Sequence, residues 1–150
     1  MNEAKPNRMA PDVQREYRTE QIVVYWEPVL CIHAAECIRG LPQAFNVRRR
    51  PWVDASAATA DEIATVVQRC PTSALRYARL DGGPAEQPDE PARIAAQPDG
   101  PLYVRGDIEL VDQDGSRRQV TRAALCRCGE SKNKPFCDNS HLECGFRTTE

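Results

Sequence analysis

Four residues that can bind a metal lie within sixteen positions near the end of the sequence: Cys126, Cys128, Cys137 and His141. A Cys-x-Cys pair in an extended or turning segment can direct both thiolates at one metal, and an i, i+4 pair shares one face of a helical turn. These soft or borderline ligands suit tetrahedral zinc, and equally a 2Fe-2S cluster, whose irons each need two protein ligands. Zinc sites usually show Cys-x2-Cys spacing, so the shorter spacing here weakens the zinc interpretation without removing it.

A second group of cysteines lies upstream, at Cys31, Cys37 and Cys70, with His33 two residues after the first. Bacterial ferredoxins carry Cys-x2-Cys-x2-Cys followed by a distant Cys-Pro. Here Cys70 precedes a proline, but Ala34 occupies the middle position of the triplet. A four-iron cubane needs four external ligands, so the pattern predicts either a 3Fe-4S cluster or a 4Fe-4S cluster with His33 as fourth ligand. The alternatives are that the cysteines are small core residues and that His33 lies at the surface or beside the ligands.

The surrounding segments predict two small domains of the α+β class. In residues 17–80, "QIVVYW" and "SALRYARL" have the composition of strands, and "TADEIATVVQRC" has helical periodicity with Thr59 or Asp61 as its cap. In residues 102–150, two strand-like runs flank Asp114-Gly115, a pair favoured in hairpin turns, and the cysteine-rich segment follows. Residues 81–101 are rich in proline, glycine and acidic residues, which predicts an extended linker.

Composition narrows the class of protein and its environment. The net charge of −2 over 150 residues gives no support to a nucleic-acid binder. The polar first twenty residues lack the apolar run of a signal peptide or membrane span, so we expect a soluble, cytoplasmic protein. In a reducing cytoplasm, seven cysteines are better explained as metal ligands or reactive thiols than as disulfides. Cys144 has no partner at ligand spacing and is expected to be a packed or exposed free thiol.

The segment from Cys126 to His141 resembles the CDGSH iron–sulfur motif of the mitoNEET-like family. Four supporting motif positions are in register: Ser131, Pro135, Asp138 and Ser140. The preceding "PLYVRGDIEL" is also similar to the first strands of that family. The resemblance implies a small β-rich domain that holds a 2Fe-2S cluster through three cysteines and one histidine. The chain departs from the motif at Asn139, where the family has glycine, but asparagine is the non-glycine residue that best tolerates a left-handed backbone.

The upstream segment resembles divergent single-cluster ferredoxins, in which Cys-x-His-x3-Cys precedes an aromatic residue, a basic run and Pro-Trp. The corresponding residues here are Phe45, Arg48–Arg50 and Pro51-Trp52. This resemblance covers about sixty residues and implies a small ferredoxin-like domain with one 3Fe-4S or 4Fe-4S cluster. We interpret the three arginines as a solvated basic face that can steer an acidic redox partner.

These features favour an electron-transfer protein with two different clusters, and none of them resembles the catalytic machinery of an enzyme. Three thiolates and a neutral imidazole leave an oxidised 2Fe-2S site at charge −1 rather than −2, which favours a higher reduction potential. Protonation of His141 would compete with iron and labilise the cluster in acid. The alternatives are cluster transfer or redox sensing, and a zinc-binding interaction module. The expected partners are a redox protein and, by analogy with the mitoNEET-like family, a second copy bound through the C-terminal domain.

Overall fold

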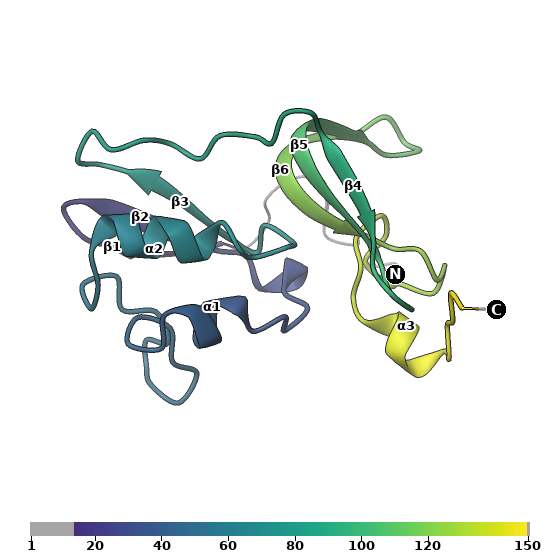
Figure 1. The fold of residues 1–150 in the computed structure, drawn as a ribbon, viewed down its shortest axis with the longest axis horizontal. Coiled ribbons are helices and arrows are strands. Elements are labelled where there is room, and N and C mark those ends of the chain that lie inside the picture. Colours follow the sequence, from purple (N-terminus) through teal and green to yellow (C-terminus); the bar gives the residue numbers. More distant parts are fainter. Residues whose placement is uncertain (1–13, 150) are drawn as a thin grey trace, which may run out of the picture. The chain divides into compact units, whose positions relative to one another are not determined.

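The computed structural model describes residues 14–149 of the chain. These residues form two compact units, of which the first spans residues 15–87 and the second includes residues 88–149. Each unit is built on a three-stranded antiparallel sheet and carries short helices or a single helical turn (Figure 1). The chain is therefore a mixed α+β protein, as the sequence predicts.

The sheet of the first unit has the order β1-β2-β3. The elements of this unit are β1 (Arg15–Arg18), β2 (Ile22–Trp26), the 3-10 turn η1 (Pro28–Leu30), α1 (Glu36–Gly40), α2 (Ala60–Val67) and β3 (Leu75–Arg79). Ile22 and Val24 of β2 share one buried core cluster with Phe45 and with Ile63 and Val67 of α2. Burial of such a side chain stabilises the fold by about 1.5–3 kcal/mol. The predicted strands and helix thus pack on one another through their apolar faces.

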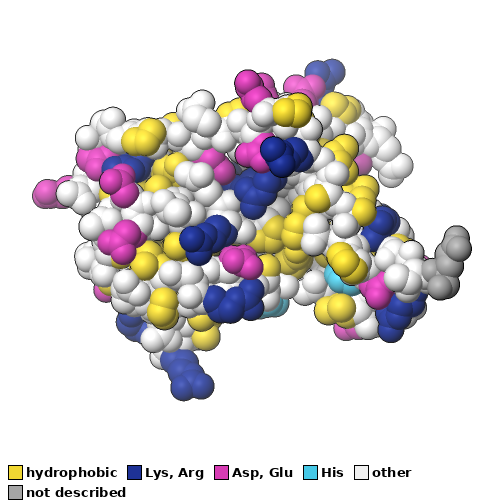
Figure 2. Space-filling view, in the orientation of Figure 1, with side chains coloured by type: hydrophobic (Ala, Val, Ile, Leu, Met, Phe, Trp, Pro, Cys, Tyr) yellow, Lys and Arg dark blue, Asp and Glu magenta, His cyan; other side chains and the backbone are white. Residues whose placement is uncertain are grey.

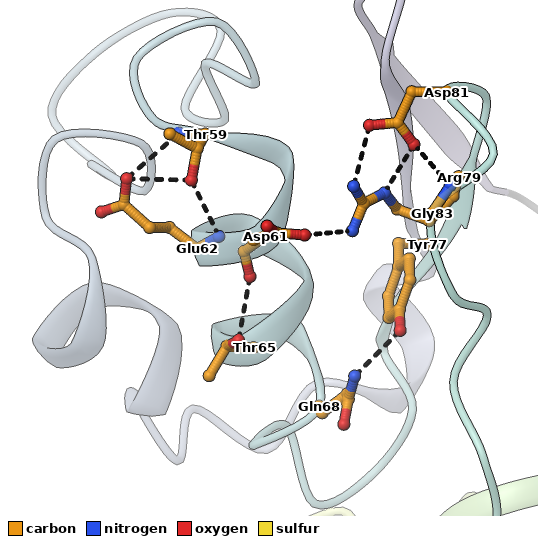
Figure 3. A network of polar contacts seen from close by, with 9 residues as sticks. All are labelled: Thr59, Asp61, Glu62, Thr65, Gln68, Tyr77, Arg79, Asp81 and Gly83. Carbon is orange, nitrogen blue, oxygen red and sulfur yellow. Dashed lines mark hydrogen bonds and ion pairs between the residues drawn. The ribbon is translucent and has the colours of Figure 1, made fainter.

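Helix α2 begins at a capping box, and Thr59 is the cap. The Thr59 hydroxyl accepts a hydrogen bond from the Glu62 N–H at 3.1 Å, and the Glu62 carboxylate accepts one from the Thr59 N–H at 3.3 Å (Figure 3). On the side of the helix that faces β3, Asp61 forms an ion pair with Arg79 at 2.8 Å. These contacts fix where the helix starts and how it lies on the sheet.

The second unit contains the sheet β4-β5-β6. Its elements are β4 (Arg93–Ala96), β5 (Leu102–Val111), β6 (Arg117–Leu125) and the single-turn helix α3 (Ser140–Glu143). β5 and β6 form the hairpin predicted at Asp114-Gly115, where Gly115 adopts a left-handed φ of 89°. Val111 pairs with Arg117 at the turn end of the hairpin, and Leu102 pairs with Leu125 at its open end, where the cysteine-rich segment starts.

Strand β4 lies inside the stretch 81–101 that composition predicts as linker. Ile94 pairs with Val104, Ala96 pairs with Leu102, and residues from Pro88 onward belong to the second unit. Pairing with β5 satisfies the backbone hydrogen-bonding groups of this segment. Amino-acid composition is a local property, so it could not indicate that this segment pairs with another strand. The linker boundary at residue 101 is therefore corrected, because residues 93–101 are part of the second sheet and its turn.

Acidic and basic side chains are interspersed on the molecular face that Figure 2 shows, as expected for a net charge of −2. No helix within residues 14–149 is both long enough and apolar enough to cross a membrane.

Candidate functional site

Residues 126–141, which carry the predicted C-terminal ligands and are called the ligand loop below, follow directly after the end of β6. An isolated antiparallel bridge joins Leu125 to Phe136. Next to it, the Cys126 N–H donates to the Pro135 carbonyl at 2.8 Å, and the Cys137 N–H donates to the Ala124 carbonyl at 2.8 Å. These bonds close the segment into a loop with Cys126 and Cys137 near its base, so the sheet positions one cysteine from each of the two spaced pairs.

The four predicted ligands of this unit lie around one small cavity, which Gly100 also lines. The Sγ atoms of Cys126 and Cys128 are 3.9 Å apart, and the Cys137 Sγ is 3.7 Å from the His141 Nδ1. Two thiolates bound to one metal at about 2.3 Å lie about 3.8 Å apart. Each pair is therefore spaced to hold one metal ion, and Nδ1 is the histidine nitrogen that faces the site.

The motif residues Ser131 and Asp138 stabilise the ligand loop. The buried Ser131 hydroxyl donates to the Phe136 carbonyl at 2.6 Å. The Asp138 carboxylate accepts hydrogen bonds from the N–H groups of Lys132 and Ser140 and from the Ser140 hydroxyl. Desolvation opposes ionisation of Asp138, but these donors outweigh it and lower the pKa of the carboxyl below its ordinary value. Asp138 therefore acts as an ionised anchor that joins Lys132, in the middle of the loop, to Ser140.

Asn139 has the left-handed backbone that its replacement of glycine requires, with φ 72° and ψ 8°. Its N–H donates to the Cys137 Sγ at 3.4 Å, and α3 begins at the next residue. Cys137 therefore precedes the helix, and the expectation that it shares a helical face with His141 is corrected. The two side chains meet because the left-handed residue turns the chain between them.

Cys144 is a neighbour of the C-terminal thiols that the spacing of the cysteines did not indicate. The Glu130 N–H bonds to the Cys128 Sγ at 3.4 Å and favours its thiolate, but desolvation and the neighbouring Cys126 and Cys144 thiols raise its pKa above the ordinary value. Burial is the main cause that raises the pKa of Cys137. Cys144 is exposed, as expected, yet it interacts with Cys128, three residues beyond His141 along the chain. Only the fold could reveal this contact.

The upstream cysteines come together in the first unit. Cys31, Cys37 and Cys70 line a cavity of about 590 Å³, together with Trp26 and Trp52. The two indole rings pack edge to face with centroids 4.9 Å apart, so one wall of the cavity is aromatic and rigid. All three cysteines are partly exposed, and Cys37 and Cys70 also pack against the hydrophobic core of the unit.

The loop from Cys31 to Cys37 has an unusual backbone. His33 and Ala35 both have positive φ values, 59° and 64°. Non-glycine residues in this conformation cluster at functional sites, where backbone N–H groups turn toward bound anions. The His33 N–H donates to the Cys31 Sγ at 3.4 Å, and the His33 Nδ1 is 3.9 Å from the same sulfur. His33 and Ala34 both line the cavity, so the histidine is within reach of the site although its side chain is exposed.

Cys70 follows α2 and does not lie on its apolar face. The helix ends at Val67, and the Cys70 N–H donates to the Val67 carbonyl at 3.1 Å. Desolvation raises the pKa of Cys37 to about 11 and also raises that of Cys31, with a further contribution from the nearby Cys70 thiol. These shifts favour the protonated thiols of Cys31 and Cys37, so a metal bound there would have to displace their protons.

The arginine run is only partly the solvated face that the sequence suggests. The Arg49 guanidinium donates to the Ala44 carbonyl at 3.0 Å and to the Gln43 carbonyl at 3.2 Å, so it braces the loop behind the cavity. Arg48 and Arg50 are exposed. Arg49 is therefore a structural residue, and the exposed Arg50 also donates to the Val47 carbonyl at 2.9 Å and lines the cavity.

Comparison with known proteins identifies both units. A family model described as a divergent 4Fe-4S mono-cluster matches residues 17–80, and a model described as an iron-binding zinc finger of the CDGSH type matches residues 99–142. The protein YjdI of Escherichia coli strain K12 is 35% identical over 63 residues, which are 42% of this chain and 83% of YjdI. YjdI of Escherichia coli O157:H7 matches to the same extent. The donor sets of both units, thiolates with one imidazole nearby, suit iron–sulfur groups. The chain thus belongs to the divergent 4Fe-4S mono-cluster family through residues 17–80, and its residues 99–142 form an iron-binding domain of the CDGSH type.

Proposed function

We propose that the protein is an electron carrier, not an enzyme, with one iron–sulfur cluster in each unit. In the second unit, Cys126 and Cys128 would bind one iron of a 2Fe-2S cluster, and Cys137 and His141 the other. In the first unit, Cys31, Cys37 and Cys70 would bind a 3Fe-4S or 4Fe-4S cluster. When bound, each cluster would accept and release single electrons.

The observation that carries this proposal is the separation of the C-terminal ligands into two close pairs. A single zinc ion would bring all four ligand atoms to within about 3.8 Å of one another. The ligand atoms are 3.9 Å apart within the Cys126–Cys128 pair and 3.7 Å apart within the Cys137–His141 pair. Within residues 14–149, no three Cys, His, Asp or Glu side chains are grouped as ligands of one metal ion. Two pairs without a common centre suit two irons better than one zinc.

The residues also support a difference in potential between the two sites. His141 replaces a thiolate by a neutral ligand, which makes the C-terminal site less negative and favours its reduction. Desolvation raises cysteine pKa values in both units, so the imidazole ligand is the feature that distinguishes the two sites. We expect the C-terminal site to have the higher potential and therefore to hold the electron when both sites exchange with one donor.

The direct test is anaerobic purification followed by iron and sulfide analysis and electron paramagnetic resonance in both redox states. We expect about five or six irons per chain, with two separable signals. Cys126→Ser should remove only the C-terminal signal, and Cys31→Ser only the N-terminal one. A colourless protein that contains zinc would contradict the proposal. His33→Ala then separates the two N-terminal cluster types, since a 3Fe-4S site would keep its oxidised signal unchanged.

A second candidate is cluster transfer or redox sensing, and His141 favours it. It supplies the one nitrogen ligand of the C-terminal set, and it is only partly buried. Under this proposal the 2Fe-2S cluster is cargo delivered to an acceptor protein. Incubation of the loaded protein with a cluster-free ferredoxin distinguishes the two functions, because transfer that completes within minutes favours the second candidate and retention favours the first.

We propose that the partner of the electron carrier is an acidic redox protein steered by Arg48 and Arg50, the two exposed members of the arginine run. Steering is an interaction between exposed charges, so the association rate should fall as ionic strength rises. A second copy of the chain, bound through the C-terminal unit, remains the proposed oligomeric partner. Sedimentation of the loaded protein tests this dimer.

A further inference from the structure

The turn between β4 and β5 forms one wall of the C-terminal cavity. Gly100 and Pro101 line this cavity together with the predicted ligands. A Cβ atom placed on Gly100 would lie 3.7 Å from the His141 Nε2, so the turn passes beside the nitrogen that faces away from Cys137. The turn is internally closed by hydrogen bonds from the Gln97 N–H to the Pro101 carbonyl at 3.0 Å and from the Gly100 N–H to the Gln97 carbonyl at 3.1 Å.

Arg127 of the ligand loop holds this turn through two hydrogen bonds, which we call the first clamp. It stands between Cys126 and Cys128, and its Nε donates to the Gly100 carbonyl at 2.9 Å while its Nη2 donates to the Gln97 carbonyl at 2.5 Å. Its guanidinium also lies over the Phe146 ring, 5.5 Å from the centroid. The planar fork of arginine can hold two carbonyls at once, which a lysine ammonium on a flexible stem does less well.

A second clamp joins the same turn to the end of the chain. The Asp99 N–H donates to the Thr148 Oγ1 at 2.9 Å, and the Thr148 N–H donates to the Asp99 Oδ1 at 2.8 Å. These reciprocal bonds connect residues 49 positions apart. Asp99 has a positive φ of 51°, so the turn is held in a conformation that its own backbone does not favour. Both sets of hydrogen bonds therefore act on the segment 97–101, which lines the cavity through Gly100 and Pro101.

We propose that Arg127 and the Asp99–Thr148 pair are positioning residues that hold the 97–101 turn against His141 and thereby slow loss of the cluster from the C-terminal site. This inference rests on the proposed iron–sulfur function. The turn covers the side of the imidazole that faces away from the metal, so it restricts both rotation of the ring and entry of water. Release of either clamp should free the ring without removing a ligand.

The test compares the loaded full-length variants Arg127→Gln, Arg127→Lys and Thr148→Val with the parent protein at one fixed, neutral pH. Loss of the C-terminal cluster is followed by its visible absorption in the presence of an iron chelator. We expect about tenfold faster loss for Arg127→Gln, which lacks charge-assisted bonds, and about threefold faster loss for Thr148→Val, which keeps the shape of the side chain but not its hydroxyl. Arg127→Lys should be intermediate.

A second readout separates positioning from the effect of charge. The reduction potential of the C-terminal site should fall in Arg127→Gln, which removes a cation beside an anionic site, and stay near that of the parent in Arg127→Lys and Thr148→Val. The matched control is Arg117→Lys, because Arg117 is exposed, forms an ion pair with Glu109 at 2.9 Å and lies at the opposite end of the same hairpin. This control should lose its cluster at the parent rate.

Two outcomes overturn the inference. The first is a parent-like rate of cluster loss in both Arg127→Lys and Thr148→Val. The second is a rate in Arg117→Lys that rises as much as in those variants, since that would reflect general loosening of the sheet. Thr148→Val changes neither a ligand nor the ligand loop, so it decides the matter even when Arg127→Gln fails to load. A parent protein without iron and sulfide would contradict the proposed function itself, and the two failures are thus distinguishable.

Discussion

Replacement of Asn139 tests the most distinctive backbone feature of the C-terminal site. Its φ of 72° places it in the left-handed region, which costs residues with a Cβ roughly 1–2 kcal/mol and asparagine less. Asn139→Gly should therefore leave local stability almost unchanged, whereas Asn139→Ala should lower it by about 1 kcal/mol. Asn139→Val should lower it further, because a β-branched side chain crowds the left-handed backbone.

Native-state hydrogen exchange measures this cost at the affected amides. The Leu142 N–H donates to the Asn139 carbonyl at 3.0 Å, and the Cys144 N–H donates to the Ser140 carbonyl at 3.0 Å, so both amides report on the turn and on α3. A loss of about 1 kcal/mol corresponds to roughly fivefold faster exchange in Asn139→Ala. Exchange in α2 serves as the internal control and should not change. Parent-like exchange in both Asn139→Ala and Asn139→Val would refute the left-handed conformation and with it the geometry of the Cys137–His141 pair.

Three further predictions test other parts of the molecule. In the loaded protein, Cys144 should be the thiol that iodoacetamide modifies, and Cys144→Ser should abolish this labelling; mass spectrometry showing modified Cys31 in the loaded protein would contradict its role as a ligand. In the cluster-free protein, the pKa of Cys37 is raised to about 11, so the folded state retains a proton that the unfolded state releases near pH 9. The free energy of unfolding should therefore fall between about pH 9 and 11. Urea titrations in which Cys37→Ser shows the same fall would disprove this cause. Thr59→Ala should destabilise the first unit by about 1 kcal/mol through loss of the capping box, as measured by tryptophan fluorescence in urea, and an unchanged midpoint would mean that the cap contributes nothing.

Much of the local structure follows from the sequence because the signals are local. The capping box at Thr59, the turn at Asp114-Gly115 and the left-handed Asn139 each depend on residues within a few positions, and the structure has all three. That the four residues predicted as C-terminal ligands lie around one cavity could also be predicted, because they fall within sixteen residues of a single loop.

The features that sequence analysis missed depend on contacts between distant segments. Strand β4 needs β5 as a partner, and its acidic, proline-rich surroundings suggested a linker. Arg127 reaches Gln97 across 30 positions, and Asp99 reaches Thr148 across 49. Hydrophobic periodicity and motif spacing describe short windows and carry no information on such pairings. The run of three arginines also gave no sign that the partly buried Arg49 donates hydrogen bonds to the Gln43 and Ala44 carbonyls.

The bridge between Leu125 and Phe136 also bears on how the site is assembled. It closes the ligand loop as an extension of β6, so the conformational entropy of bringing Cys126 close to Cys137 is lost when the sheet folds and not when metal arrives. If these residues bind iron as proposed, Cys126 and Cys137 are the half of the donor set that the sheet places before metal arrives. The loop is closed at its base by the hairpin but bordered by the 97–101 turn, so its sixteen residues should keep much of their affinity for metal on another antiparallel hairpin only if that turn is transferred with them.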